Sequence, residues 1–275
     1  MDAEKLRKAG RVAARVRDET AERIIEGATY MDILDYCESR IEELGAGICW
    51  AQLSPSTTAA HFSPTTQDNP VCRPGDLVKL DIGVHVDGWI ADTAVSVLIE
   101  GGEDEALKKD LMKASQNALS AVEKIIAPGV KLHELGAAQY SEAERFGFTT
   151  IKNLCGHTVG RYTVHSGVSI PSFDNGDSRE VEPGWLCAIE PFVTDGNGMI
   201  AEKGTPTIFM QEAERNVRSP QGRKVLQSIR GRNGMPFATR DIERKLGRAT
   251  AVLGIRDLHK QNIIHPYPPL VEVSE

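Results

Sequence analysis

The sequence predicts an α+β fold in which helices precede antiparallel strands twice along the chain. Apolar residues recur at helical spacing ahead of residues 45 and 147, and runs that alternate like strands follow each helical stretch. The two halves also resemble each other. Gly27 and Gly45 lie 18 residues apart, as do Gly129 and Gly147, and the two pairs are offset by 102 residues. Such a repeated pattern indicates an internal duplication.

The helices are predicted as two pairs. Apolar residues at intervals of three and four predict an amphipathic helix over 2–26. Thr29 can cap a second helix, which Gly45 ends. The same pattern predicts the second pair of helices over 104–126 and 129–147.

Strand-like runs follow each pair of helices. Residues 77–86 and 89–99 alternate well and are joined by Asp87-Gly88, the strongest short signal for a β-hairpin. In the second half, the apolar run 185–193 predicts a further strand, and 270–273 predicts the beginning of another.

Acidic residues fall where a sheet should be apolar. With a two-residue turn, partner numbers across the hairpin sum to 175, so Asp81 faces Ala94 and Asp92 lies diagonally from Asp81 on the same face. Like charges this close are costly unless a cation lies between them or one is protonated. His157 and Glu190 could complete a site for divalent metals such as Mn, Fe, Co or Zn. Carboxylate-rich sets of this kind can hold two ions.

Composition excludes several classes of protein. A chain of 275 residues with 40% hydrophobic and 26% charged residues suits one large or two small globular units. No run approaches the roughly 18 apolar residues of a membrane-spanning helix, and the charged first ten residues do not resemble a signal peptide. We therefore expect a cytoplasmic location. The five scattered cysteines, without a CxxC pair, are typical of reduced thiols.

The net charge of −7 hides one basic segment. Residues 215–260 carry twelve Lys or Arg against three acidic residues, a local charge of +9, so the rest of the chain sums to −16. Two short helical patterns, over 221–231 and 239–246, lie in this window on either side of a Gly-Met-Pro break. The change of composition predicts an inserted subdomain.

Five stretches form a set that is far more specific than any one of them. They are Ala59 to Pro64, Lys79 to Gly83 with Asp87-Gly88 and Asp92, Asn153 to Gly160 with His165, Ala188 to Pro191 with Gly196 and Gly198, and Pro266 to Pro268. In order and spacing this set resembles the type II methionine aminopeptidases, which are pita-bread metallopeptidases, and among them the short archaeal form.

The resemblance implies a pita-bread (creatinase/aminopeptidase-like) fold: a curved antiparallel sheet flanked by helix pairs related by pseudo-twofold symmetry, with a helical, winged-helix-like insertion. The implied domains are a catalytic domain over 1–205, the insertion typical of type II enzymes over 206–265, and a return to the catalytic domain over 266–275.

The resemblance also implies roles for single residues. Its metal ligands correspond to Asp81, Asp92, His157 and Glu190, and its catalytic, substrate-binding imidazoles to His61 and His165. Asp92 is expected to bridge two divalent ions, of Co, Mn, Fe, Zn or Ni. The implied activity is removal of the initiator methionine from nascent proteins by attack of a metal-bound water or hydroxide. Nascent N-termini are the expected substrates, the ribosome is a candidate partner, and a monomer without membrane or nucleic-acid partners is expected.

The chain departs from the family pattern in three places. The family's fifth metal ligand is a glutamate in a Gln-x-Glu-His-Thr-like final strand, whereas this sequence ends at Glu275, and neither Glu272 nor Glu275 is taken as that ligand. Cys49-Trp50 and Ser54 to Ser56 stand where a Phe-Pro pair and asparagines usually line the methionine pocket. Cys155 stands in place of a small polar residue and can itself bind a soft metal.

Two alternatives remain open beside the metallo-aminopeptidase. The first is an X-Pro aminopeptidase or prolidase, which usually carries an additional N-terminal domain, whereas the first predicted helix here begins near Met1. The second is a catalytically silent pita-bread binding protein, which the absent fifth ligand favours and the four persisting ligands oppose. The absent carboxylate also predicts a weaker second metal and an open sheet edge.

Overall fold

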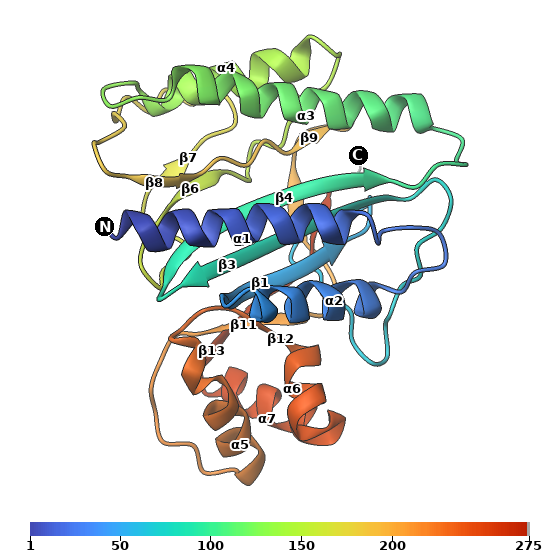
Figure 1. Cartoon of the computed structure of the whole chain (residues 1–275), viewed down its shortest axis with the longest axis vertical. Helices are drawn as coiled ribbons and strands as arrows, with labels where there is room; N and C mark the ends of the chain where they lie inside the picture. The colour runs from blue at the N-terminus through green and yellow to red at the C-terminus, as the bar shows by residue number, and fades with distance from the viewer. Residues whose placement is uncertain (274–275) are drawn as a thin grey trace.

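Two pairs of helices stand against antiparallel strands, and a smaller helical unit lies at one end of the molecule (Figure 1). The computed structural model describes residues 1–273, so Glu275 lies outside the described residues. The helices are α1 (Ala3–Ala21), α2 (Tyr30–Glu43), α3 (Glu105–Ile125), α4 (Leu132–Glu144), α5 (Pro220–Ile229), α6 (Thr239–Leu246) and α7 (Arg248–Lys260), with a 3₁₀ turn at Arg230–Arg232.

The strands are mostly short and pair antiparallel. They are β1 (Gly47–Ser54), β2 (Thr58–Ala60), β3 (Leu77–Val86), β4 (Trp89–Leu98), β5 (Thr149–Thr150), β6 (Gly156–Val159), β7 (Ser169–Ile170), β8 (Leu186–Ala188), β9 (Val193–Thr194), β10 (Ile200–Glu202), β11 (Ile208–Gln211), β12 (Phe237–Ala238), β13 (Ile264–Tyr267) and β14 (Leu270–Glu272). The sheet orders are β1-β3-β4, β7-β6-β8, β5-β9, β10-β14-β2 and β12-β11-β13.

The first pair of helices begins where the sequence predicts. The carboxylate of Asp2 accepts a hydrogen bond from the backbone N–H of Lys5 at 3.2 Å, and the Thr29 hydroxyl accepts one from the N–H of Asp32 at 3.2 Å. Apolar faces of α1 and α2 then cover β1 and β3, and their buried side chains form one continuous core. This core fixes one side of the sheet that carries Asp81 and Asp92.

The predicted β-hairpin is confirmed in its register. Val86 pairs with Trp89 across the turn, Asp81 pairs with Ala94, and Gly83 pairs with Asp92. β1 adds a third strand on the other edge of β3. Period-two alternation therefore puts Asp81 and Asp92 on the same face, as the turn arithmetic requires.

The predicted duplication of the helix pairs is confirmed by matching backbone hydrogen bonds. The N–H of Gly27 donates to the carbonyl of Cys72 at 2.9 Å, and the N–H of Gly129 donates to the carbonyl of Val181 at 2.9 Å. Gly27 and Gly129 both have positive φ, of 82° and 91°, which only glycine adopts without strain. α2 and α4 therefore each begin shortly after the same kind of glycine turn.

The strands after each pair repeat at a different offset. Pro74-Gly75 and Pro183-Gly184 lie 109 residues apart, and β3 and β8 each begin two residues after the glycine. The same offset relates Asp81 to Glu190. These two carboxylates thus occupy matching places in the two halves.

The prediction of one strand over 185–193 is wrong. The structure instead has β8 over Leu186–Ala188 and β9 over Val193–Thr194, with Glu190 in the irregular segment between them. Pro191 provides the physical reason, because proline has no N–H for a ladder and restricts the residue before it. The interruption leaves the Glu190 side chain outside the regular pairing of either strand.

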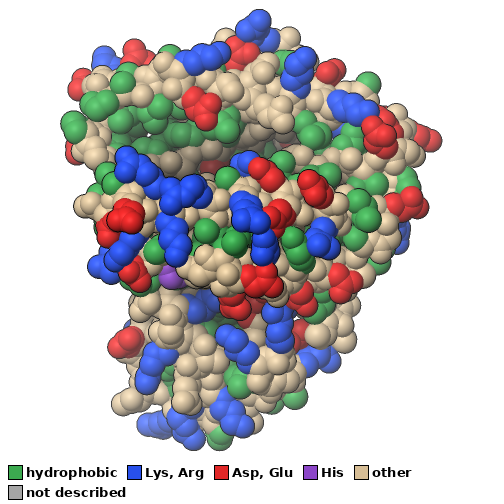
Figure 2. Space-filling view, viewed as in Figure 1, with side chains coloured by type: hydrophobic (Ala, Val, Ile, Leu, Met, Phe, Trp, Pro, Cys, Tyr) green, Lys and Arg blue, Asp and Glu red, His purple; other side chains and the backbone are tan. Residues whose placement is uncertain are grey.

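The basic segment forms a unit with its own core. α5 and α6 confirm the two predicted helices, and α7, which the sequence analysis did not predict, packs against both. Buried apolar side chains from these helices, β11, β12 and β13 make up that core. Lys and Arg side chains outnumber acidic ones over this unit at the bottom of Figure 2. Within residues 1–273, no helix is long and apolar enough to cross a membrane.

Candidate metal centre

Three of the predicted ligands converge on one point. Asp92, His157 and Glu190 each offer a ligand atom, and these three atoms all lie within 4.8 Å of one another. Nε2 of His157 is 2.9 Å from Oε1 of Glu190 and 3.7 Å from Oδ2 of Asp92. His157 is buried, and the two carboxylates are partly buried.

Both halves of the chain supply these residues. Asp92 lies on β4, whereas His157 lies on β6 opposite Ala188 of β8. Glu190 follows two residues after Ala188, which brings its carboxylate beside the imidazole. The site therefore lies between the two duplicated units, with Asp92 within the long strand β4, His157 on the short strand β6 and Glu190 just after β8.

The acidic groups of the site are buried and repel one another. Burial, followed by the charges of Glu190 and Asp81, raises the pKa of Asp92 well above its ordinary value. Burial also raises the pKa of Asp81 to about 7. Burial opposes a charge on His157, but the hydrogen bond and charge of Glu190 outweigh it and raise the pKa of the imidazole.

Asp81 lies close to this group but is not one of the three converging residues. The indole N–H of Trp50 donates to Oδ1 of Asp81 at 2.6 Å, and the amide N–H of Gln52 donates to Oδ2 at 3.4 Å. The charge of Asp81 nevertheless contributes to the raised pKa of Asp92. From the sequence, Trp50 is only a departure from the family's methionine pocket, and no sequence pattern singles out Gln52.

The two predicted substrate imidazoles lie in the same region. The ring of His165 packs edge-on against that of His157, with centroids 4.3 Å apart. His61 packs edge-on against Tyr267 at 5.3 Å. Burial lowers the pKa of both His61 and His165, and the charges of His157 and His61 lower that of His165 further. Both imidazoles are therefore neutral at pH 7.

His61 has two features typical of a functional residue. Its backbone φ is 63°, in the left-handed region that non-glycine residues seldom adopt. Its buried Nδ1 has no hydrogen-bond partner among the described residues 1–273. A buried polar atom of this kind is rare and indicates a group that is satisfied by a ligand or water.

Two further residues of the sequence analysis lie apart from this arrangement. The carboxylate of Glu272 accepts hydrogen bonds from the Thr194 hydroxyl at 2.7 Å and from the N–H of Gly198 at 3.4 Å. Cys155 is a half-buried free thiol. Neither residue belongs to the converging group of Asp92, His157 and Glu190.

The donor set fits a divalent transition metal. Two carboxylates and one imidazole are ligands that suit Mn, Fe, Co and Zn. Their proximity, combined with raised pKa values, is the arrangement expected where a cation offsets the repulsion between buried acids.

A comparison with protein families shows which family the chain belongs to. The model of metallopeptidase family M24 matches residues 4–218. The chain belongs to this family. A methionine aminopeptidase of Thermococcus onnurineus is 40% identical over 273 residues, which cover 98% of this chain and 91% of that protein.

Solved structures place this M24 chain in the pita-bread fold. The methionine aminopeptidase of Thermotoga maritima is 26% identical, covers 73% of this chain and 82% of its own, and has a TM-score of 0.67. The solved structure of a thermophilic Arx1 has a TM-score of 0.85 over 98% of this chain and 83% of its own. At 15% identity, that second likeness concerns the fold alone.

Proposed function

We propose that this chain is a cytoplasmic methionine aminopeptidase that removes the initiator methionine from nascent polypeptides. The observation that carries the proposal is the convergence of Asp92, His157 and Glu190 in an M24 chain. It is supported by relatives of that name, 40% and 37% identical over nearly the whole chain. A monomer that meets nascent chains at the ribosome, without membrane or nucleic-acid partners, is the proposed form.

The proposed metal ligands are Asp81, Asp92, His157 and Glu190, which would together hold two divalent cations. Divalent cations bound there supply Lewis acidity and bring the pKa of a water molecule toward neutrality. Because the ligands come from both halves of the chain, the substrate's first peptide bond is held where these halves meet.

His61 and His165 are the proposed substrate contacts. Both are neutral at pH 7, so each ring can donate one N–H and accept one hydrogen bond. A ring N–H directed at the scissile carbonyl stabilises the negative charge that develops on its oxygen.

Peptide hydrolysis tests the proposed function. With Mn(II) or Co(II) added, we expect the chain to release methionine from Met-Ala-Ser, and from Met-Leu-Ser roughly 100-fold more slowly, because a small second residue is required. The measurement is the initial rate of methionine release, followed by chromatography, with the metal chelator EDTA as the control.

Other outcomes would favour the alternatives. Hydrolysis of Ala-Pro-Ser with no release of methionine would support an X-Pro aminopeptidase. No hydrolysis of any of the three peptides at saturating metal would contradict the enzymatic proposal and support a binding protein.

The binding of metal is expected to strengthen with rising pH. Burial raises the pKa of Asp81 to about 7, above its ordinary 3.8, so a proton must leave before a cation binds below that pH. The apparent affinity for Mn(II) should therefore rise between about pH 6 and 8. Calorimetric titrations at three pH values, in buffers of different ionisation enthalpy, measure both the affinity and the protons released. An affinity that is constant over this range would contradict the assignment of Asp81.

A further inference from the structure

We propose that Trp50 and Gln52 are positioning residues of the metal site, a role that rests on the proposed function. Trp50 and Gln52 lie on β1, beside β3, and both contact the carboxylate of Asp81. Gln52 also contacts the backbone of His61. One pair of side chains thus links a proposed metal ligand to a proposed substrate imidazole.

Trp50 holds one oxygen of the Asp81 carboxylate. It lies opposite Gly83 in the β1–β3 ladder, and its indole N–H donates to Oδ1 of Asp81 at 2.6 Å. A Cβ atom at Gly83 would lie 2.4 Å from ring carbons of Trp50, so the missing side chain makes room for the indole. The ring is buried among apolar side chains that include Ile90, which fixes its orientation.

Gln52 uses both ends of its amide. It pairs directly with Asp81 in the ladder, and its N–H donates to Oδ2 of that carboxylate at 3.4 Å. Its amide oxygen accepts a hydrogen bond from the backbone N–H of His61 at 2.9 Å. Gln52 is 8% exposed as a residue, so little bulk water competes for these bonds.

The N–H groups of Trp50 and Gln52 together orient the carboxylate of Asp81. One N–H on each oxygen fixes the rotation of the carboxylate and leaves the remaining lone pairs for a ligand. Partners that orient a metal ligand in this way commonly change metal affinity by about 10- to 100-fold when they are removed.

The second link concerns the strained backbone at His61. A residue with φ of 63° persists only where its surroundings hold it, and the hydrogen bond to Gln52 is one such restraint.

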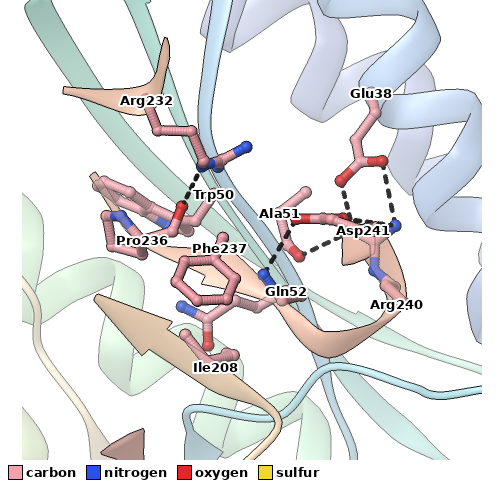
Figure 3. Close-up of a pocket in the computed structure, with 11 residues that line it drawn as sticks. Glu38, Trp50, Ala51, Gln52, Ile208, Arg232, Pro236, Phe237, Arg240 and Asp241 are labelled. Carbon is pink, nitrogen blue, oxygen red and sulfur yellow. Dashed lines mark hydrogen bonds and ion pairs between the residues drawn. The ribbon is translucent and has the colours of Figure 1, made fainter. Parts of the chain in front are cut away.

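The inserted unit restrains the other side of β1. Arg232 donates to the carbonyl of Cys49 at 2.7 Å, and Figure 3 shows Phe237 of the insertion with Trp50 and Gln52 around one small pocket.

Two variants separate the contacts with Asp81 from the contact with His61. Trp50→Phe keeps an aromatic ring but removes the N–H, whereas Gln52→Leu removes both bonds of the amide. We expect each to weaken Mn(II) binding by about 10- to 100-fold in calorimetry. At saturating Mn(II), Trp50→Phe should recover most of its kcat for Met-Ala-Ser. Gln52→Leu should not, because His61 has lost its restraint. Recovery by metal distinguishes positioning from general loss of structure.

Matched controls are Trp185→Phe and Gln139→Leu. Trp185 lies before β8, and Gln139 is a buried amide on α4 that donates to the carbonyl of Pro171 at 3.0 Å. Neither contacts Asp81, so both should bind Mn(II) like the unmodified chain. The thermal midpoint of every metal-free variant is measured in parallel, and Trp50→Phe should lie close to the unmodified chain.

The outcomes distinguish the two proposals. If the unmodified chain binds Mn(II) and cleaves Met-Ala-Ser while both variants do so equally well, the positioning role is wrong and the proposed function stands. If the unmodified chain neither binds Mn(II) nor cleaves, the proposed function is wrong and this inference is overturned with it. A loss of affinity in the variants equal to that in their matched controls would also overturn it.

Discussion

Replacing Asp92 by asparagine is expected to abolish Mn(II) binding and to lower kcat/KM for Met-Ala-Ser by more than about 100-fold. Removal of a residue that merely orients a ligand already costs about 10- to 100-fold, and Asp92 is one of the three converging residues proposed as ligands. Asparagine keeps the shape of the side chain but removes the negative charge. Calorimetry and initial rates at saturating metal measure the two effects.

The same substitution is expected to stabilise the metal-free chain. Burial and the charges of Glu190 and Asp81 raise the pKa of Asp92, so its ionised form is unfavourable without a cation. Because the folded-state pKa lies above the unfolded value, this penalty increases as pH rises between the two values. The thermal midpoint of Asp92→Asn at pH 8 should therefore exceed that of the unmodified chain, a gain in stability at the expense of function.

Asp110→Asn is the matched control for this experiment. Asp110 is exposed on α3, and its substitution should leave metal binding, activity and the thermal midpoint unchanged. If Asp92→Asn bound Mn(II) as tightly as Asp110→Asn does, Asp92 would not be a ligand.

Replacing Arg240 by methionine is expected to lower the free energy of unfolding by about 3 to 5 kcal/mol. The guanidinium side chain is 1% exposed and forms a two-point ion pair with the carboxylate of Glu38 on α2, drawn in Figure 3. Its Nε also donates to the Ser63 hydroxyl at 3.0 Å. Its removal leaves the buried carboxylate of Glu38 with only the partly exposed Arg244 as a charged partner, at 3.3 Å, and this loss costs more than the ion pair itself contributes.

Arg244 provides the comparison for Arg240. It contacts Asp35 and Glu38 but is 46% exposed, so Arg244→Met should cost less than about 1 kcal/mol. The double variant Glu38→Gln with Arg240→Met should regain part of the loss, because no charge is then left buried alone. Urea unfolding of the three variants measures these differences. Equal losses for Arg240→Met and Arg244→Met would contradict this account of the ion pair.

The sequence predicts best what short-range rules determine. The Asp87-Gly88 turn sets the β3–β4 register residue by residue, which is why the relation of Asp81 to Asp92 follows from numbering alone. The caps at Asp2 and Thr29 are likewise local. The glycines at 102-residue spacing reveal the repeated helices.

The sequence does not predict the long-range contacts of the site. No tight turn joins β1 to β3, so nothing in the sequence sets the register that places Gln52 beside Asp81. Arg240 and Glu38 are 202 residues apart, and one arginine in a basic segment resembles any other. One available signal was missed: the Pro-Gly pairs 109 residues apart relate Asp81 to Glu190 and reveal the strand repeat directly.

The end of the 185–193 run shows how a local rule can override a pattern. Apolar composition predicts a continuous strand there, but Pro191 interrupts it directly after Glu190. The number of bound metal ions and the domain bounds 206–265 stay predictions.

Crystals soaked in Zn(II) and measured at the zinc absorption edge test the central claim most directly. The account predicts an anomalous peak about 2.0 to 2.2 Å from Nε2 of His157 and from carboxylate oxygens of Asp92 and Glu190. A peak elsewhere, with none between these three side chains at saturating Zn(II), would contradict the metallopeptidase account.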